Sequence, residues 1–91
     1  MTDLFYENKV FNGHIELWDV SNVTTMDGMF EYAEKFNQPI GDWDVRNANN
    51  MAYMFCYAYK FNKSIRDWDV SNVINMEGMF WNAFAFNQDI S

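Results

Sequence analysis

Residues 18–30 read Trp-Asp-Val-Ser-Asn-Val-Thr-Thr-Met-Asp-Gly-Met-Phe. Parts of this stretch recur at a fixed interval, and this repetition is the main evidence for the fold. The first six residues of the stretch recur unchanged at 68–73, and its Trp-Asp-Val start recurs at 43–45. The interval is 25 residues each time. A fixed period of this length indicates an array of small units, each of which buries its apolar face against its neighbours.

The repeat extends outward from this stretch over the whole chain. A Phe-Asn pair begins each unit, and residues 11–35 and 61–85 are identical at 14 of 25 positions without an insertion. The sequence therefore predicts one domain, residues 1–91, of about three and a half repeats. The repeats are a partial one at 1–10, complete ones at 11–35, 36–60 and 61–85, and a partial one at 86–91.

Two periodicities within one repeat predict its secondary structure. Met26, Met29, Phe30 and Ala33 follow the i, i+3, i+4, i+7 spacing of one helix face. Trp-Asp-Val alternates apolar and polar residues, which favours a short strand with Trp and Val facing inward. We expect an α/β repeat fold, a right-handed curved solenoid with one short strand and one short helix per repeat. The recurring Asn residues are expected to bond to the backbone inside each coil.

Composition narrows the classes of partner. The net charge is −7 and only six residues are Lys or Arg, which argues against a nucleic-acid partner and against an anionic membrane surface. No apolar run approaches the roughly 20 residues of a membrane span, so no membrane insertion is expected. Met1-Thr2-Asp3 does not resemble the start of a signal peptide. The single Cys56 is expected to be an exposed thiol outside any disulfide.

The run Trp-Asp-Val-Ser-Asn-Val, followed by Met-x-x-Met-Phe-x-x-Ala and Phe-Asn-Gln, resembles the BspA-like leucine-rich repeat of bacterial surface proteins. This repeat type also occurs in mycoplasma surface lipoproteins and in large viruses of algae and protists. The resemblance implies a leucine-rich-repeat-like solenoid that serves adhesion or protein binding, at a cell surface or in association with a virus. It brings no catalytic residue and no cofactor. Arg46 and Ala48 depart from the pattern, and no lipoprotein cysteine stands near Met1.

An acidic face is the first candidate contact surface. Asp19, Asp44 and Asp69 share one repeat position opposite the inward Trp and Val, and Asp42 and Asp67 point the same way. Unit charges about 5 Å apart repel by just under about 1 kcal/mol in bulk water. Three arrangements offset this repulsion: hydrogen bonds from backbone amides or Ser and Asn side chains, a basic protein partner, or Ca²⁺ held between coils.

An aromatic face is the second candidate contact surface. The predicted helices carry Tyr53, Tyr57, Tyr59 and Trp81 beside or opposite their apolar stripe. Exposed Tyr and Trp are typical of protein contact surfaces, although large aromatic side chains also shield a thin layer in a small domain. Both interpretations stay open on the sequence alone.

No catalytic or metal-ligating constellation is recognisable. The repeated Met residues have the spacing of a core, and His14 is the only histidine and has no counterpart in other repeats. We therefore expect a non-enzymatic protein-binding or scaffold module without metal or cofactor. The alternative is a structural component that self-assembles, or docks into a viral or cell-surface assembly, through uncapped solenoid ends whose last repeat leaves an apolar flank bare.

Overall fold

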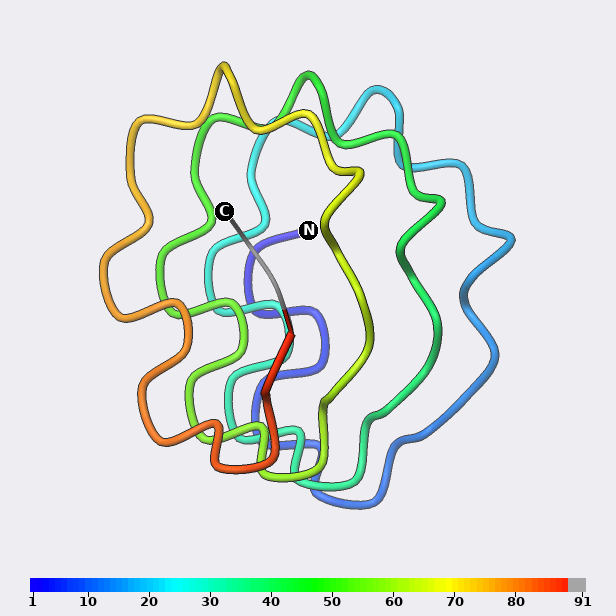
Figure 1. The fold of residues 1–91 in the computed structure, drawn as a ribbon, viewed down its shortest axis with the longest axis vertical. Coiled ribbons are helices and arrows are strands. Elements are labelled where there is room, and N and C mark those ends of the chain that lie inside the picture. The colour runs from blue at the N-terminus through cyan, green and yellow to red at the C-terminus, as the bar shows by residue number, and fades with distance from the viewer. Residues whose placement is uncertain (89–91) are drawn as a thin grey trace.

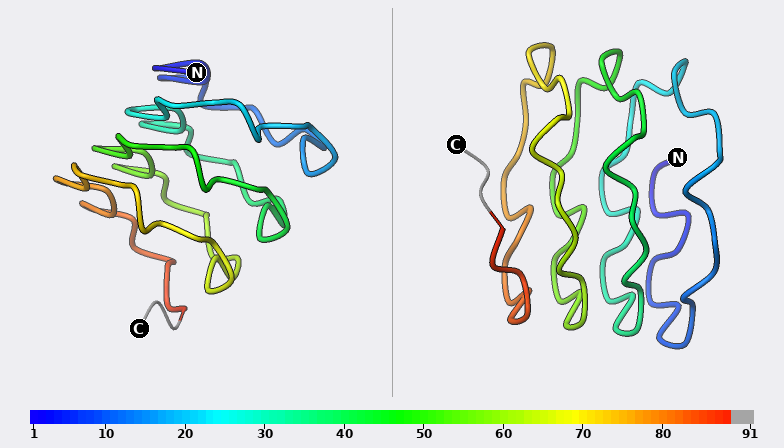
Figure 2. Two further views of the ribbon diagram at one scale, coloured as in Figure 1. Left: turned by 90° about the horizontal axis from the view of Figure 1, so that it is seen from above. Right: turned by 45° about the vertical axis from the view of Figure 1, so that its right-hand side comes forward.

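The computed structural model describes residues 1–88, in which the chain winds as successive coils lying side by side (Figure 1). Figure 2 shows the same stack from two other directions, with the blue first coil at one end and the orange last coil at the other. Hydrogen bonds between side chains and backbone join residues that are 25 positions apart, so one repeat makes one coil.

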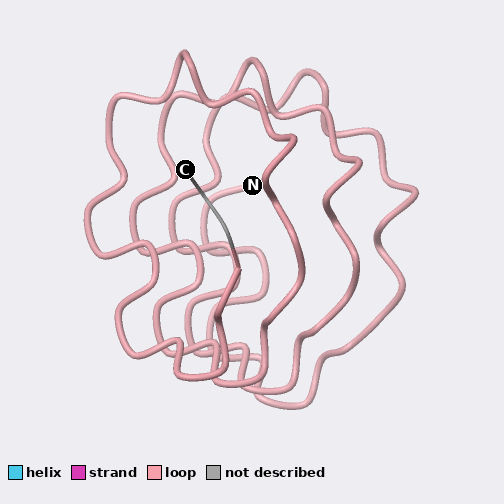
Figure 3. Ribbon diagram, in the orientation of Figure 1, coloured by secondary structure: helices cyan, strands magenta, loops and turns pink. Residues whose placement is uncertain are grey.

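The predicted α/β solenoid with a strand and a helix in each repeat is wrong. Residues 1–88 contain no helix and no strand, only turns, connecting segments and two isolated parallel bridges (Figure 3). These bridges join Thr25 to Asn50 and Asn50 to Asn75. The coils are therefore held together without the regular elements that the periodicity predicted.

The backbone N–H groups of residues 26–33 explain why no helix forms. Every second N–H donates to a carbonyl 24 residues later, in the next coil, and those of Met29, Glu31 and Ala33 donate three residues back. An α-helix would send them four residues back instead. The bonds to the next coil run from Met26 to Asn50 (2.9 Å), Gly28 to Ala52 (2.8 Å), Phe30 to Met54 (2.9 Å) and Tyr32 to Cys56 (2.9 Å).

Left-handed backbone at two positions per coil completes these turns. Gly28 and Tyr32 have φ of 65° and 61°, and Tyr53 and Tyr57 repeat this in the next coil with 57° and 59°. Each residue is third in a four-residue turn, the position at which a type II turn requires positive φ. Such residues interrupt a right-handed helix. Consecutive turns return side chains to one side every three or four residues, so the apolar spacing fits turns as well as a helix.

The core consists of identical side chains stacked from coil to coil. Two parallel columns of phenylalanine rings run through it, and neighbouring rings of the two columns lie 4.0–4.3 Å apart. One column is Phe5, Phe30, Phe55 and Phe80, with ring centroids 5.5–5.6 Å apart. The other is Phe11, Phe36, Phe61 and Phe86, with centroids 5.8–5.9 Å apart.

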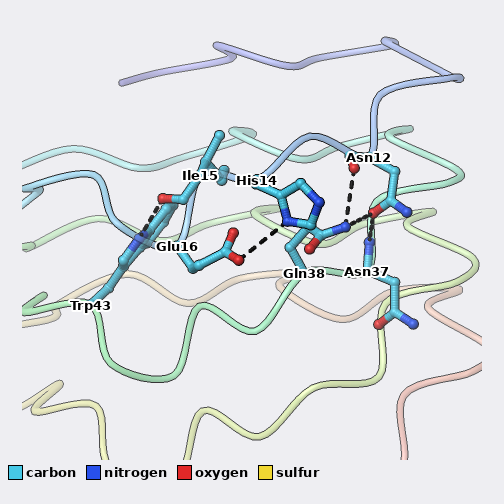
Figure 4. Close-up of polar contacts among 7 residues, drawn as sticks. All are labelled: Asn12, His14, Ile15, Glu16, Asn37, Gln38 and Trp43. Carbon is cyan, nitrogen blue, oxygen red and sulfur yellow. Dashed lines mark hydrogen bonds and ion pairs between the residues drawn. The ribbon is translucent and has the colours of Figure 1, made fainter.

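The middle Trp-Asp-Val segment faces inward without being a strand, whereas Trp18 in the first segment and Val70 in the last are exposed. Trp43 and Val45 are buried and Asp44 is exposed, in the alternation that the sequence predicts. Turn bonds fold the chain on either side, from Trp43 N–H to Ile40 (3.1 Å) and from Ala48 N–H to Val45 (2.9 Å). The indole Nε1 of Trp43 also donates to the carbonyl of Ile15 in the preceding coil (3.1 Å) (Figure 4).

The recurring asparagines connect neighbouring coils, so the prediction that they bond inside one coil is wrong for this column. The backbone N–H of Asn37 donates to Asn12 Oδ1 at 2.9 Å, a bond visible in Figure 4. Asn62 and Asn87 repeat this bond to the coil before them, each at 2.9 Å. A side-chain amide ladder therefore supports the backbone ladder on another side of each coil.

Candidate functional site

The acidic face is built from carboxylates that accept hydrogen bonds within their own coil. Asp19 Oδ1 accepts the backbone N–H of Ser21 at 3.0 Å and its hydroxyl at 2.6 Å. Asp69 and Ser71 repeat both distances. Because these bonds favour the charged form, above all the bond from the serine hydroxyl, the pKa values of Asp19 and Asp69 are lowered.

The other members of the acidic face are also exposed. Asp44 lies beside Arg46, with 3.3 Å between Arg46 Nε and Asp44 Oδ2. Asp42 and Asp67 stand on the surface of their coils. Within residues 1–88, no three His, Cys, Asp or Glu side chains lie together in a group that could hold a metal ion. A role of these five carboxylates in protein contact stays a prediction.

The aromatic face contains a continuous series of ring contacts, which we call the tyrosine ladder. At its centre Tyr32 and Tyr57 stack at 4.6 Å with 5° between their planes. Tyr6 meets Tyr32 edge-on at 6.0 Å, and Tyr59 meets Tyr57 in the same way at 6.0 Å. Phe84 ends the ladder by stacking on Tyr59 at 5.6 Å. The ladder is thus Tyr6, Tyr32, Tyr57, Tyr59 and Phe84.

Sequence reasoning found only part of this surface. It named Tyr57 and Tyr59 on the flanks of the predicted helix but missed Tyr6, Tyr32 and Phe84. The signal was present, because Tyr32 and Tyr57 are separated by one 25-residue period and therefore occupy the same position in adjacent coils. The helix interpretation hid it, since a helix would have placed Tyr57 on a flank rather than at a left-handed turn position.

Tyr53 and Trp81 form a separate aromatic pair on the neighbouring turn. Their rings meet at 5.6 Å with 75° between the planes, and Trp81 is 56% exposed. The pair lies over Gly78, where an added Cβ would be 2.6 Å from Tyr53 Cδ1 and 3.2 Å from Trp81 Cδ2. Glycine at this position leaves room for both rings, which come from two adjacent coils.

Carboxylates lie at the edge of these aromatic side chains. Burial raises the pKa of Glu31, and the negative charges of Asp3 and Glu7 raise it further. Glu7 also raises the pKa of Tyr6, chiefly through its charge, while burial and then Glu77 raise the pKa of Tyr53. The aromatic face therefore carries a concentration of negative charge.

The two end coils expose side chains that are buried in interior coils. Met76 is 44% exposed, whereas Met26 and Met51 in the same repeat position are fully buried. A groove of about 360 Å³ opens beside Met76 at this end of the stack. Its walls are mainly apolar and consist of Ile65, Arg66, Trp68, Val70, Met76, Met79 and Phe80.

Comparison with known proteins places the chain in a family. The family DUF285, described as Mycoplasma protein of unknown function, matches residues 1–91. The chain belongs to this family. No curated protein and no solved structure matches this DUF285 chain. In the described part of this DUF285 protein, residues 1–88, no helix is long and apolar enough to cross a membrane.

The DUF285 chain has one histidine and one cysteine. His14 lies on the surface with Nδ1 3.3 Å from Glu16 Oε2 (Figure 4). Cys56 is only 2% exposed, so the prediction of an exposed thiol is wrong. The coils on either side carry Glu31 and Trp81 at the same repeat position. Burial raises the pKa of the thiol, and the negative charge of Glu31 raises it further.

Proposed function

We propose that this DUF285 chain is a non-enzymatic protein-binding module, and that the tyrosine ladder with the Tyr53–Trp81 pair is its contact surface. One observation carries the proposal: stacked aromatic rings stand in contact with one another at the surface, with Phe84 76% and Trp81 56% exposed. Tyr and Trp supply large contact areas at low cost in side-chain entropy and are enriched where protein interfaces are strongest.

The charge around this surface favours a basic partner. Asp3, Glu7 and Glu31 lie close enough for their charges to act on one another. Arginine complements such a surface in two ways, because its guanidinium group stacks on aromatic faces and pairs with carboxylates. The exposed aspartates Asp19, Asp42, Asp44, Asp67 and Asp69 extend the negative potential over another side of the coils.

The resemblance of the repeat to BspA-like repeats of bacterial surface proteins supports the same function. Proteins with that repeat type serve adhesion, which depends on contact with other macromolecules. A location at a cell surface or on a virus particle is part of this proposal.

A binding experiment with synthetic peptides tests the proposal. Fluorescently labelled peptides of equal length, one rich in arginine, one neutral and one acidic, are titrated with the protein and followed by anisotropy. We expect the arginine-rich peptide alone to bind, and Phe84→Ser combined with Trp81→Ser to weaken it at least about tenfold. The matched control is Leu17→Ser, because Leu17 is 95% exposed and lies outside the aromatic face.

Two results would contradict this function. Equal weakening by the control Leu17→Ser would show that the aromatic face is not the contact surface. Binding of none of the three peptides would remove the basic partner. Circular dichroism melts of all variants establish that each protein is folded, and we expect the melts to coincide if the rings serve contact rather than shielding.

A second function is favoured by the ends of the stack. Two side chains at this groove, Val70 and Met76, are exposed, whereas the residues at the same repeat positions in the two preceding coils are buried. We propose as the alternative that the chain is a structural component that joins a larger assembly through its end coils.

A further inference from the structure

Backbone hydrogen bonds join each interior coil to the coils on both sides. Within residues 1–88, an end coil makes these bonds on one side only. The N–H groups of Met51, Tyr53, Phe55 and Tyr57 each donate to a carbonyl of the next coil. Their acceptors are Asn75 (2.9 Å), Glu77 (2.8 Å), Met79 (2.9 Å) and Trp81 (2.8 Å). Each interface between coils therefore consists of donors from one coil and acceptors from the next, which gives the stack a direction.

Within residues 1–88, the last coil presents the donors of this pattern without acceptors. The N–H groups of Met76, Gly78, Phe80 and Asn82 occupy the same repeat positions as the interior donors, and no acceptor for them lies within residues 1–88. An unpaired row of backbone donors at an edge is a template for pairing with another chain.

The first coil presents the matching acceptors. The carbonyls of Thr2, Leu4 and Tyr6 accept no hydrogen bond from the described residues. The equivalent carbonyls of Asp27, Met29 and Glu31 accept bonds of 2.8–3.0 Å from the coil before them. The two end coils therefore have complementary backbone edges in the register of the repeat.

We propose that a second copy of this chain stacks head to tail on the first, as a specific form of the assembly function proposed above. The N–H groups of Gly78, Phe80 and Asn82 of one copy donate to the carbonyls of Thr2, Leu4 and Tyr6 of the second copy. The first coil of the second copy then takes the place that a further repeat would occupy.

Side-chain sizes at one repeat position agree with this pairing. Along the stack this position alternates between a side chain and glycine: Asp3, Gly28, Tyr53 and Gly78. Asp3 lies over Gly28 so closely that an added Cβ would collide with its carboxylate, and Tyr53 Cε1 would lie 2.5 Å from a Cβ at Gly78. Head-to-tail stacking places Asp3 of the second copy next to Gly78 and continues the alternation.

The phenylalanine columns continue in the same register. Phe80 and Phe86 stack at 4.3 Å in the last coil, and Phe5 and Phe11 stack at 4.0 Å in the first. The equivalent rings of interior coils follow one another at centroid distances of 5.5 Å, from Phe30 to Phe55, and 5.9 Å, from Phe36 to Phe61. Because the two contacting surfaces differ, the contact is heterologous and allows chains longer than a dimer.

Two charge substitutions test the proposal by complementation. Met76→Glu places a charge at one end coil and Leu4→Glu at the other, where Leu4 is 49% exposed. Sedimentation velocity over a hundredfold concentration range measures the mass, which for one copy is 10.9 kDa. We expect wild type to form oligomers that grow with concentration, and each variant alone to remain monomeric.

Mixing the two variants decides whether pairing is head to tail. Met76→Glu retains the acceptor edge and Leu4→Glu retains the donor edge, so we expect a one-to-one dimer that does not grow further. Leu17→Glu is the control and should assemble like wild type. Hydrogen exchange provides a second readout, since the amides of Gly78, Phe80 and Asn82 should exchange more slowly as wild type assembles.

Three outcomes overturn the proposal: monomeric wild type at every concentration, growth of either single variant, or variants that fail to pair when mixed. Circular dichroism of each variant establishes that it is folded. Monomeric wild type that still binds the arginine-rich peptide overturns head-to-tail stacking and leaves the protein-binding function in place. Assembly without peptide binding supports head-to-tail stacking and overturns the protein-binding function.

Discussion

The pattern Met-x-x-Met-Phe-x-x-Ala occurs at residues 51–58 and again at 76–83. These two segments lie in different surroundings, one in an interior coil and one in the last coil. Met51 and Phe55 are fully buried, whereas Met76 is 44% exposed and Phe80 is only partly buried. The sequence pattern is the same, but within residues 1–88 a neighbouring coil lies on only one side of 76–83. Each coil therefore supplies only part of its own core, and the coils on both sides supply the rest.

Truncation of the phenylalanine column is the strongest way to test this comparison. Phe55→Ala should cost about 3–5 kcal/mol, because it removes a buried ring that stacks on rings in both neighbouring coils. This is close to the whole stability of a small domain. Phe80→Ala should cost clearly less, since its ring meets a neighbouring coil on one side only.

Urea denaturation followed by tryptophan fluorescence measures the free energies of unfolding of wild type and both variants. Measurements at low protein concentration keep assembly from adding to the stability of the end coil. Equal losses in the two variants would contradict a core that is shared between neighbours.

Residues with left-handed φ also have different surroundings in these two repeats. Asn82 in the last coil has φ of 56° and is exposed, whereas Tyr57 has φ of 59° and stacks on Tyr32. Asn82→Gly should stabilise the protein by about 0.5–1 kcal/mol because glycine adopts this φ without strain. Tyr57→Gly should destabilise it, since the loss of ring contacts outweighs the relief of strain.

Thermal and urea unfolding of the two glycine variants measure these changes. The sign for Asn82→Gly also distinguishes turns from a helix, because glycine in a helix interior would lower the stability. A destabilised Asn82→Gly would therefore argue against the turn at this position.

The smallest expected effect belongs to contacts that stay within one coil. Asp19 and Asp69 accept the same two hydrogen bonds from the following serine, although their coils lie at different places in the stack. Their lowered pKa values add stability that is present above the ordinary pKa of Asp and is lost as the pH falls through the lowered pKa. We expect both carboxyl groups to show this shift.

Carboxyl titration by NMR measures the two pKa values. Ser21→Ala should raise the pKa of Asp19 toward its ordinary value and leave that of Asp69 unchanged, and Ser71→Ala should do the reverse. A shift of both groups in either variant would show that this contact depends on neighbouring coils.

Much of the core was predictable because it depends on which side of the chain a residue faces. The inward direction of Trp43 and Val45 and the burial of Met29 and Met54 agree with the apolar pattern. The predicted helix and strand were wrong because the same spacing fits a series of turns. Tyr32 and Tyr57 have left-handed φ, which tyrosine residues rarely adopt, and nothing in their local sequence indicates it.

The sequence predicted single residues of the aromatic face but not the ring contacts between coils. Trp81 and Tyr53 were expected at the surface and form a pair there, but the ladder through Tyr32 and Tyr59 depends on contacts between coils. The burial of Cys56 was missed because the predicted helix placed this residue on the side away from the apolar stripe.

The 25-residue period followed from the amino-acid sequence alone, and with it the prediction that residues at equivalent repeat positions stack on one another. The sequence also determined the acidic surface, through its charge and the exposed Asp positions. The carbonyl groups that accept hydrogen bonds from the backbone N–H groups depend on the tertiary structure. Alternate N–H groups of residues 26–33 bond to their own turn and to the next coil. The physical reason is that a turn with left-handed residues persists only when the neighbouring coil accepts the remaining donors, and local sequence does not record that neighbour.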